Sequence, residues 1–198
     1  MKLRPYVFIV EFWNFLRFKL LNFLIPNIRN IYSKKLSYLD VPNCQQRTIV
    51  TGIGKTHIGS QCKFGYKKGG FHKNGCVELQ TRYENSVIQI SNDVATNNNV
   101  FICCANYIEI GENTRIGQNV TLMDFEAHGI NPNERSKVGS IGQIVLKKNV
   151  WVGNNVIILK NSEIGENSVV AAGAVVSGIF PSNVIIGGIP AKIIKNID

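Results

Sequence analysis

Histidine is the side chain of this sequence best suited to moving a proton near neutral pH, because neutral imidazole accepts a proton there. The chain has three, His57, His72 and His128. His128 stands in the segment MDFEAHGINPNER, where Asp124 and Glu126 precede it by four and two residues. A carboxylate at that spacing can hold one ring nitrogen and leave the other free to act as a base. The alternative is a solvated loop with one histidine and two exposed charges.

An aliphatic residue recurs every six positions through the second half of the chain. The series is Ile110, Ile116, Leu122, Leu146, Val152, Ile158, Ile164, Val170 and Val176. Three positions after seven of these come residues that adopt a left-handed backbone at low cost, namely Asn113, Asn119, Asn149, Asn155, Asn161, Asn167 and Gly173. Six residues are too few for a helical repeat. The pattern therefore predicts short parallel strands joined by corners, with three strands in each 18-residue coil.

Two stretches interrupt this period. Leu122 and Leu146 are four periods apart, so residues 123–145 either continue the coil irregularly or leave it as a loop and return in phase. Residues 52–65 look like a poorer start of the same repeat. Residues 66–88 include the basic, glycine-rich run YKKGGFHKNG, which predicts a loop or an irregular coil.

Repeats such as IGENTR-IGQNVT and IGENSV-VAAGAV resemble the hexapeptide repeats of the left-handed parallel β-helix acyltransferases. The resemblance covers about residues 50–195 and implies an all-β fold, a left-handed parallel β-helix, which departs from the right-handed crossover preference. We expect an N-terminal amphipathic helical segment at 1–45 and a β-helix acetyltransferase domain at 46–198, with a loop at 123–145 and a C-terminal tail. The resemblance also implies a homotrimer with active sites between subunits.

The segment around His128 is similar to the D-x-D-x-H or D-x-x-H element of sugar and polysaccharide O-acetyltransferases, which include the galactoside, maltose and nodulation-factor enzymes. The resemblance implies that His128 is the general base for acetyl transfer from acetyl-CoA to a hydroxyl group. Asp124 or Glu126 would orient its ring, although Glu126 replaces the usual aspartate. Asn97 matches an asparagine that contacts the substrate, and its alternative is one more corner asparagine.

From Trp151 onward the chain follows the family's C-terminal pattern almost residue by residue. The residues that the resemblance assigns to acetyl-CoA are Trp151, Asn154, Ala172, Gly173, Ser177, Lys192 and Lys195. Trp151 would also face the substrate, the small residues would allow close backbone approach, and the lysines would meet the coenzyme phosphates. A tight coil and a solvated tail are the alternatives. Ser177-Gly178-Ile179 replaces the family's T-K-D, so coenzyme A affinity is expected to be lower or its tail placed differently.

Positive charge is concentrated at the N-terminus. The formal net charge is +9, and the first 35 residues hold seven basic residues against one acidic residue, which is 7 − 1 = +6. The basic residues are Lys2, Arg4, Arg17, Lys19, Arg29, Lys34 and Lys35. The remaining chain is close to balanced. We therefore expect no nucleic-acid partner.

The same segment is apolar and aromatic. At helical spacing one face carries Ile9, Phe12, Trp13, Leu16, Leu20, Phe23 and Leu24, with Glu11, Asn14 and Asn22 opposite. Charges within the run make a spanning helix costly. Residues 5–25 are predicted to be a helix that lies on an anionic membrane surface or packs on this or another subunit.

The expected function is an acetyl-CoA-dependent sugar O-acetyltransferase in cell-surface polysaccharide biosynthesis (O-antigen, capsule or exopolysaccharide), cytoplasmic or at the inner membrane face. An amino-sugar N-acetyltransferase and a non-catalytic membrane-associated scaffold are the alternatives, and the scaffold does not explain the pattern from Trp151 to Lys195. No metal is expected, because the three histidines lack the close spacing of a zinc-dependent β-helix hydratase. Five cysteines without a CxxC pair fit a reducing compartment.

Overall fold

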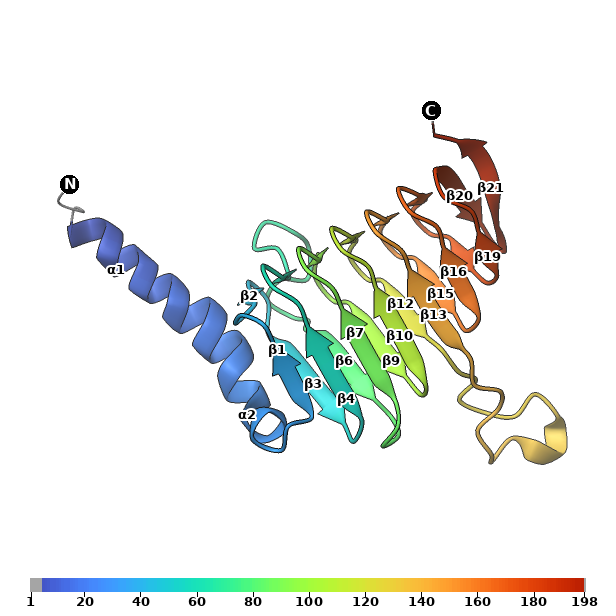
Figure 1. Cartoon of the computed structure of the whole chain (residues 1–198), viewed down its shortest axis with the longest axis horizontal. Helices are drawn as coiled ribbons and strands as arrows, with labels where there is room; N and C mark the ends of the chain where they lie inside the picture. Colours follow the sequence, from blue (N-terminus) through green and yellow to red (C-terminus); the bar gives the residue numbers. More distant parts are fainter. Residues whose placement is uncertain (1–4, 198) are drawn as a thin grey trace.

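The computed structural model describes the backbone of residues 5–197 and the side chains from Ile9 to Ile197. Lys2 and Arg4, which contribute to the predicted basic segment, lie outside the described residues, as do the side chains of residues 5–8. A rod-like helix leads into one end of a prism built from short strands, and the C-terminus lies at the other end (Figure 1).

Three sheets form the faces of the prism. Sheet A contains β1 (Leu36–Tyr38), β4 (Lys55–Ile58), β7 (Val87–Ile90), β10 (Tyr107–Ile110), β13 (Gln143–Leu146), β16 (Ser162–Ile164) and β19 (Ile179–Phe180). Sheet B contains β2 (Asn43–Cys44), β5 (Lys63–Phe64), β8 (Ala95–Thr96), β11 (Arg115–Ile116), β14 (Trp151–Val152), β17 (Val169–Val170), β20 (Val184–Gly188) and β21 (Ala191–Asn196). Sheet C contains β3 (Thr48–Gly52), β6 (Val77–Thr81), β9 (Phe101–Cys104), β12 (Thr121–Met123), β15 (Ile157–Leu159) and β18 (Val175–Val176).

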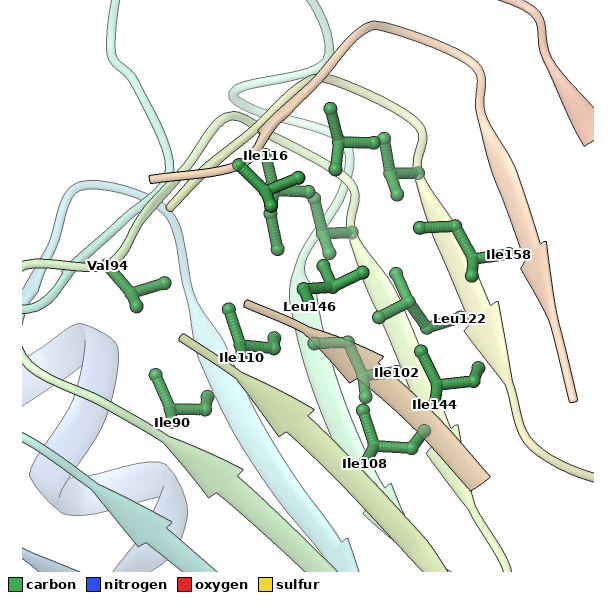
Figure 2. Packing of buried hydrophobic residues seen from close by; sticks show 14 of the residues in the cluster. Ile90, Val94, Ile102, Ile108, Ile110, Ile116, Leu122, Ile144, Leu146 and Ile158 are labelled. Carbon is green, nitrogen blue, oxygen red and sulfur yellow. The ribbon is translucent and has the colours of Figure 1, made fainter. Parts of the chain in front are cut away.

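The chain visits the three faces in turn, so strands stack in parallel on those of the previous coil. Ile110 pairs with Leu146 on sheet A, and Leu122 pairs with Ile158 on sheet C. The last pair, β20 with β21, is antiparallel. All nine residues of the six-residue series are at most 3% exposed. Figure 2 shows several of them pointing into the interior of the prism. The predicted parallel β-helix and the inward phase of its repeat are confirmed.

The corners also form as predicted. Asn113, Asn149 and Asn167 adopt φ values of 60°, 58° and 60°, in the left-handed region that asparagine tolerates. Their side chains stack on one another, since the amide nitrogen of Asn113 donates to Asn149 and that of Asn149 donates to Asn167, each at 3.0 Å. These asparagines therefore adopt the turn conformation and also join neighbouring coils through side-chain hydrogen bonds.

The two irregular stretches leave the coil as loops. Leu146 follows Ile110 by 36 positions, twice the 18-residue coil, because the chain departs after Met123 and rejoins sheet A at Gln143. The other excursion is shorter than the irregular range 66–88, since β6 already begins at Val77. The coil itself starts with β1 and β2, ahead of residue 46.

The N-terminal segment is helical from Pro5 to Tyr32, as α1 (Pro5–Asn14), a π-helix η1 (Phe15–Leu24) and α2 (Ile25–Tyr32). The side chains of its predicted apolar face differ in their exposure to solvent. Phe23 is fully buried against the prism, whereas Phe12 and Trp13 are 53% and 60% exposed. The reason is that the rod projects beyond the prism (Figure 1), and the wider π turns rotate the face that α-helical spacing predicts.

Asparagines of the helix cap the prism. Asn27 is fully buried, donates to the Thr48 carbonyl oxygen at 2.9 Å and accepts from the Val50 N–H at 2.7 Å. Asn22, predicted to lie on the polar face, instead donates to the Cys44 carbonyl oxygen at 2.7 Å. These side chains form hydrogen bonds with backbone groups of the edge strand β3 and the nearby coil, which would otherwise be unpaired. No helix among residues 5–197 is long and apolar enough to cross a bilayer.

Candidate active site

His128 projects from the loop between β12 and β13, at the edge where sheet C meets sheet A. Its ring nitrogen Nδ1 lies 2.7 Å from the carbonyl oxygen of Arg135. A carbonyl oxygen only accepts, so Nδ1 carries the hydrogen and Nε2 keeps its lone pair when the ring is neutral. The side chain is exposed, and its free nitrogen is therefore available to a molecule in solution.

Asp124 does not orient His128. The carboxylate is fully buried, and Oδ1 accepts from the Ala105 N–H at 2.6 Å while Oδ2 accepts from the N–H groups of Asn106 and Tyr107, both at 2.9 Å. Burial and the charge of Asp124 raise the pKa of the neighbouring Cys104 thiol. Asp124 fastens the start of the loop to the corner of the preceding coil.

Glu126 has a similar anchoring position. Its Oε2 accepts from the N–H of Ser140 at 3.1 Å and from its hydroxyl at 3.0 Å, and Oε1 lies 3.3 Å from Nζ of Lys160. The hydrogen bonds from Ser140, and then Lys160, lower the pKa of this carboxyl group. Both predicted carboxylates therefore shape the loop, while a backbone carbonyl holds the ring.

Sequence reasoning did not single out Arg135 or Asn106. Arg135 acts through its backbone, which has no side-chain signature in a sequence. Asn106 lies at the same edge one coil earlier and donates its amide to the Gly142 carbonyl oxygen at 2.9 Å, which closes the base of the loop. The available signals were the position of Arg135 in the segment that contains His128 and, for Asn106, a break in the repeat at 104–107.

Four of the eight other predicted site residues lie along a different edge. The residues at corners between sheets B and C are Asn97, Asn154, Ala172 and Gly173. Asn154 accepts from the Gln118 N–H at 2.8 Å through its side chain. Ala172 and Gly173 are exposed, and a Cβ atom added at Gly173 would meet nothing within 4 Å.

The remaining predictions divide between sheet B and the histidine edge. Trp151 is 59% exposed on β14, and Lys192 and Lys195 are exposed on β21 at the C-terminal end of the same sheet. Ser177 follows β18 and lies at the edge between sheets C and A, as His128 does. The structure thus separates His128 from most residues assigned to acetyl-CoA.

Asn97 lines a hollow of about 370 Å³ on sheet B and its B–C edge. The hollow also contains Lys63, Tyr66 and Arg115. The Arg115 guanidinium donates to neutral acceptors, among them Oδ1 of Asn113 at 2.9 Å. Hydroxyl, amide and cationic groups facing one hollow are suited to a polar ligand.

Comparisons with known proteins agree with the repeat. Residues 143–178 match the family described as bacterial transferase hexapeptide (six repeats). The chain is 36% identical over 121 residues to a putative lipopolysaccharide biosynthesis O-acetyl transferase, WbbJ, of Escherichia coli, covering 55% of this chain and 60% of that protein. It is 35% identical over 115 residues to the galactoside O-acetyltransferase of the same organism, covering 57% and 56%. The chain thus matches little more than half the length of these curated relatives.

A solved structure shows the same fold. A mutant of AntD, an N-acyltransferase from Bacillus cereus, in complex with dTDP and coenzyme A, superposes with a TM-score of 0.51 at 16% identity, covering 86% of this chain and 89% of that one. The protein is a left-handed parallel β-helix of hexapeptide repeats. Over residues 143–178 its sequence is similar to the bacterial hexapeptide-repeat transferases.

Proposed function

We propose that this protein is an acetyl-CoA-dependent O-acetyltransferase that acts on a sugar hydroxyl in cell-surface polysaccharide biosynthesis. The observation that carries the proposal is His128, exposed, with Nδ1 held by the Arg135 carbonyl and Nε2 free. The names of the curated relatives, a lipopolysaccharide O-acetyl transferase and a galactoside O-acetyltransferase, support the acceptor class.

The proposed role of His128 is general-base catalysis. Acetyl-CoA supplies the acetyl group as a thioester. Nε2 takes the proton of the acceptor hydroxyl as its oxygen bonds to the acetyl carbon, and the proton then passes to the sulfur as the carbon–sulfur bond breaks. The Arg135 carbonyl keeps Nδ1 protonated and fixes the tautomer throughout. No covalent enzyme intermediate is needed.

The B–C edge and sheet B fit the extended shape of coenzyme A. Ala172 and Gly173 leave the edge open to close approach of a chain, and Trp151 offers an exposed aromatic surface beside them. Lys192 and Lys195 are exposed, and neither forms an ion pair within the part of the chain that the structure describes. They are positioned to meet phosphate groups.

Because the histidine edge and the coenzyme edge differ, we propose that each site forms between two chains of a homotrimer. His128 of one chain would face the B–C edge of its neighbour. Ile157 and Leu159 on the outer face of sheet C, and Ile179 on sheet A, are 40%, 36% and 79% exposed, which suits association of prism faces.

The N-terminal rod supports a further part of the proposal, that residues 5–25 bring the enzyme to the inner face of an anionic membrane. Ile9, Phe12 and Trp13 are more than half exposed, and Arg17 lies on the same rod. An amphipathic helix of this composition adsorbs at a lipid interface. In this arrangement the helical part of the predicted segment 1–45 attaches and caps the catalytic body, which begins with β1 and β2 rather than at residue 46.

The test is an acetyl-transfer assay with the full chain. Thioester consumption is measured with a panel of sugars and amino sugars, and each product is analysed by mass spectrometry and alkaline hydrolysis to separate esters from amides. We expect consumption that depends on a sugar hydroxyl and an ester product. An amide product would assign the enzyme to amino-sugar N-acetylation. Binding of acetyl-CoA without transfer to any sugar would overturn the proposed acceptor.

A further inference from the structure

A second, strongly cationic hollow lies where the N-terminal helix meets the prism. Its volume is about 270 Å³, and four basic side chains line it, Arg17, Arg47, His72 and Lys73. They come from three segments far apart in the sequence, namely the helix, the turn before β3 and the loop between β5 and β6. No residue of the described lining is acidic.

Neutral amides hold these segments in place. Gln46 is buried, and its Nε2 donates to the Phe71 carbonyl oxygen at 2.8 Å while its Oε1 accepts from the Asn99 N–H at 2.8 Å. Asn22 fastens the helix to the Cys44 carbonyl oxygen at 2.7 Å. Because amides and backbone groups make these bonds, the basic side chains are not needed to hold the segments together. The Arg17 guanidinium lies over the Phe18 ring, 5.8 Å from its centroid.

The positive charges are uncompensated. Across residues 9–197, the ion pairs all lie elsewhere, and none includes Arg17, Arg47 or Lys73. Bringing cations into one hollow is unfavourable through mutual repulsion. An anion bound among them would attract each cation, so the electrostatic energy of the cluster would become favourable.

His72 provides an independent sign of a missing partner. Its Nδ1 atom is buried and has no hydrogen-bond partner in the structure. A buried polar atom without a partner is destabilising and is uncommon in folded proteins. His72 also lines the hollow, so its ring lies next to the space in which we place an oxyanion.

We infer that this hollow binds a phosphate group, as a phosphate ester or a diphosphate. Two guanidinium groups offer paired donors that match phosphate oxygens, and lysine and histidine add further donors. A phosphate carries more charge than a carboxylate and suits four basic groups better. The inference does not depend on acetyl transfer, because the hollow lies apart from the histidine loop between β12 and β13.

The phosphate could belong to a membrane or to a soluble molecule. Arg17 links the hollow to the rod that carries the exposed Phe12 and Trp13, so an adsorbed helix would bring the hollow close to lipid headgroups. The same chemistry would hold the diphosphate of a sugar carrier in solution. Both sources present the same group to the same four side chains.

The experiment compares two probes, inorganic pyrophosphate by calorimetry and vesicles of phosphatidylcholine with phosphatidic acid by co-sedimentation. All proteins are full chains that also carry Lys192→Ala and Lys195→Ala, which removes the proposed coenzyme phosphate site. In that background Arg47→Gln with Lys73→Gln should weaken binding of at least one probe by about tenfold or more, because charge-assisted hydrogen bonds are lost. Arg17→Gln should also weaken this binding, because Arg17 lines the hollow from the N-terminal helix.

The matched control is Lys34→Gln with Lys55→Gln, two exposed lysines outside the hollow that give the same change in net charge. This control should bind each probe as tightly as the protein that carries only Lys192→Ala and Lys195→Ala. Loss of pyrophosphate binding would identify a soluble phosphate, and loss with vesicles alone would identify a lipid headgroup. Equal weakening in the control, or no binding of either probe, would overturn the inference. Acetyl transfer by the otherwise unaltered chain is a separate readout, so the two proposals fail independently.

Discussion

His128 relies on a backbone carbonyl for its orientation. The bond between Nδ1 and the Arg135 oxygen, at 2.7 Å, selects the tautomer that a general base requires. This arrangement leaves Asp124 and Glu126 free to build the loop that carries both groups. The separation of these roles at the residue scale leads to two different mutational outcomes.

Replacing His128 by alanine should lower acetyl transfer by about 10²–10⁴-fold, because the acceptor proton then has no positioned base. Acetyl-CoA binding should stay nearly unchanged, since most residues proposed to bind the coenzyme lie away from the histidine edge. Steady-state kinetics and calorimetry measure the two effects. Glu126→Gln is the comparison and should retain most of the turnover. Wild-type turnover in His128→Ala would remove this residue from the mechanism.

Asp124→Asn should instead reduce the stability of the fold. The new amide nitrogen would face backbone N–H groups at 105–107 that now donate to the carboxylate, and a buried donor without a partner destabilises by about 1–3 kcal/mol. Urea unfolding monitored by circular dichroism measures this change. A variant that lost turnover at unchanged stability would indicate a direct role for Asp124 in the chemistry.

At the scale of elements, the N-terminal helix has two parts with different surroundings. The second part caps the prism through Phe23, Asn27 and neighbouring asparagines. The first part extends beyond the prism with its aromatic side chains exposed (Figure 1). The sequence left packing and adsorption as alternatives. The structure shows packing for the second part, and adsorption is our proposal for the first part.

Phe12→Ser with Trp13→Ser should reduce sedimentation with vesicles that contain phosphatidylglycerol, because the exposed aromatic surface is lost. For the wild type, binding should also fall as salt concentration rises, since the basic part of the attraction is screened. A control pair, Leu39→Ser with Ile53→Ser, removes side chains that are 76% and 53% exposed outside the helix and should bind normally. Equal sedimentation of all three proteins, or none by the wild type, would argue against membrane contact through this helix.

At the scale of the whole molecule, the prism places its two proposed half-sites on different edges. His128 lies between sheets C and A, while Ala172 and Gly173 lie between sheets B and C. A rigid coil cannot bring two of its edges together within one chain. A second chain with the same fold can supply the missing half, and cyclic association supplies it to every member.

Mixed trimers test this arrangement. One chain carries His128→Ala, and the other carries Ala172→Trp, which places a bulky side chain on the exposed coenzyme edge. If sites form between chains, random equal mixing should restore about one quarter of wild-type activity, because one site in four combines two unaltered halves. The chains are mixed in denaturant, refolded and assayed, with each variant refolded alone as the control. Activity no higher than that of the separate variants would show that the site lies within a single chain.

The six-residue spacing by itself determined the coil, its inward residues and its corners. These features are local, because an aliphatic side chain and an asparagine three positions later specify a strand and a left-handed turn without distant partners. The return to phase after residue 123 was also visible in the sequence, because Leu122 and Leu146 are four periods apart, whereas the choice between a loop and an irregular coil was not. His128 could be selected from the sequence because it lies within residues 123–145, where the six-residue period is interrupted.

Only the tertiary structure decided which groups meet. Either Asp124 or Glu126 was predicted to orient His128. Asp124 is instead bonded to an earlier coil, and the Arg135 carbonyl oxygen lies next to the ring nitrogen where a carboxylate was expected. The cationic hollow likewise gathers Arg17, Arg47 and Lys73 from distant segments. Such contacts depend on how a loop and a helix settle on the prism, and no short-range pattern encodes them, because their energy arises between residues that are neighbours only after folding.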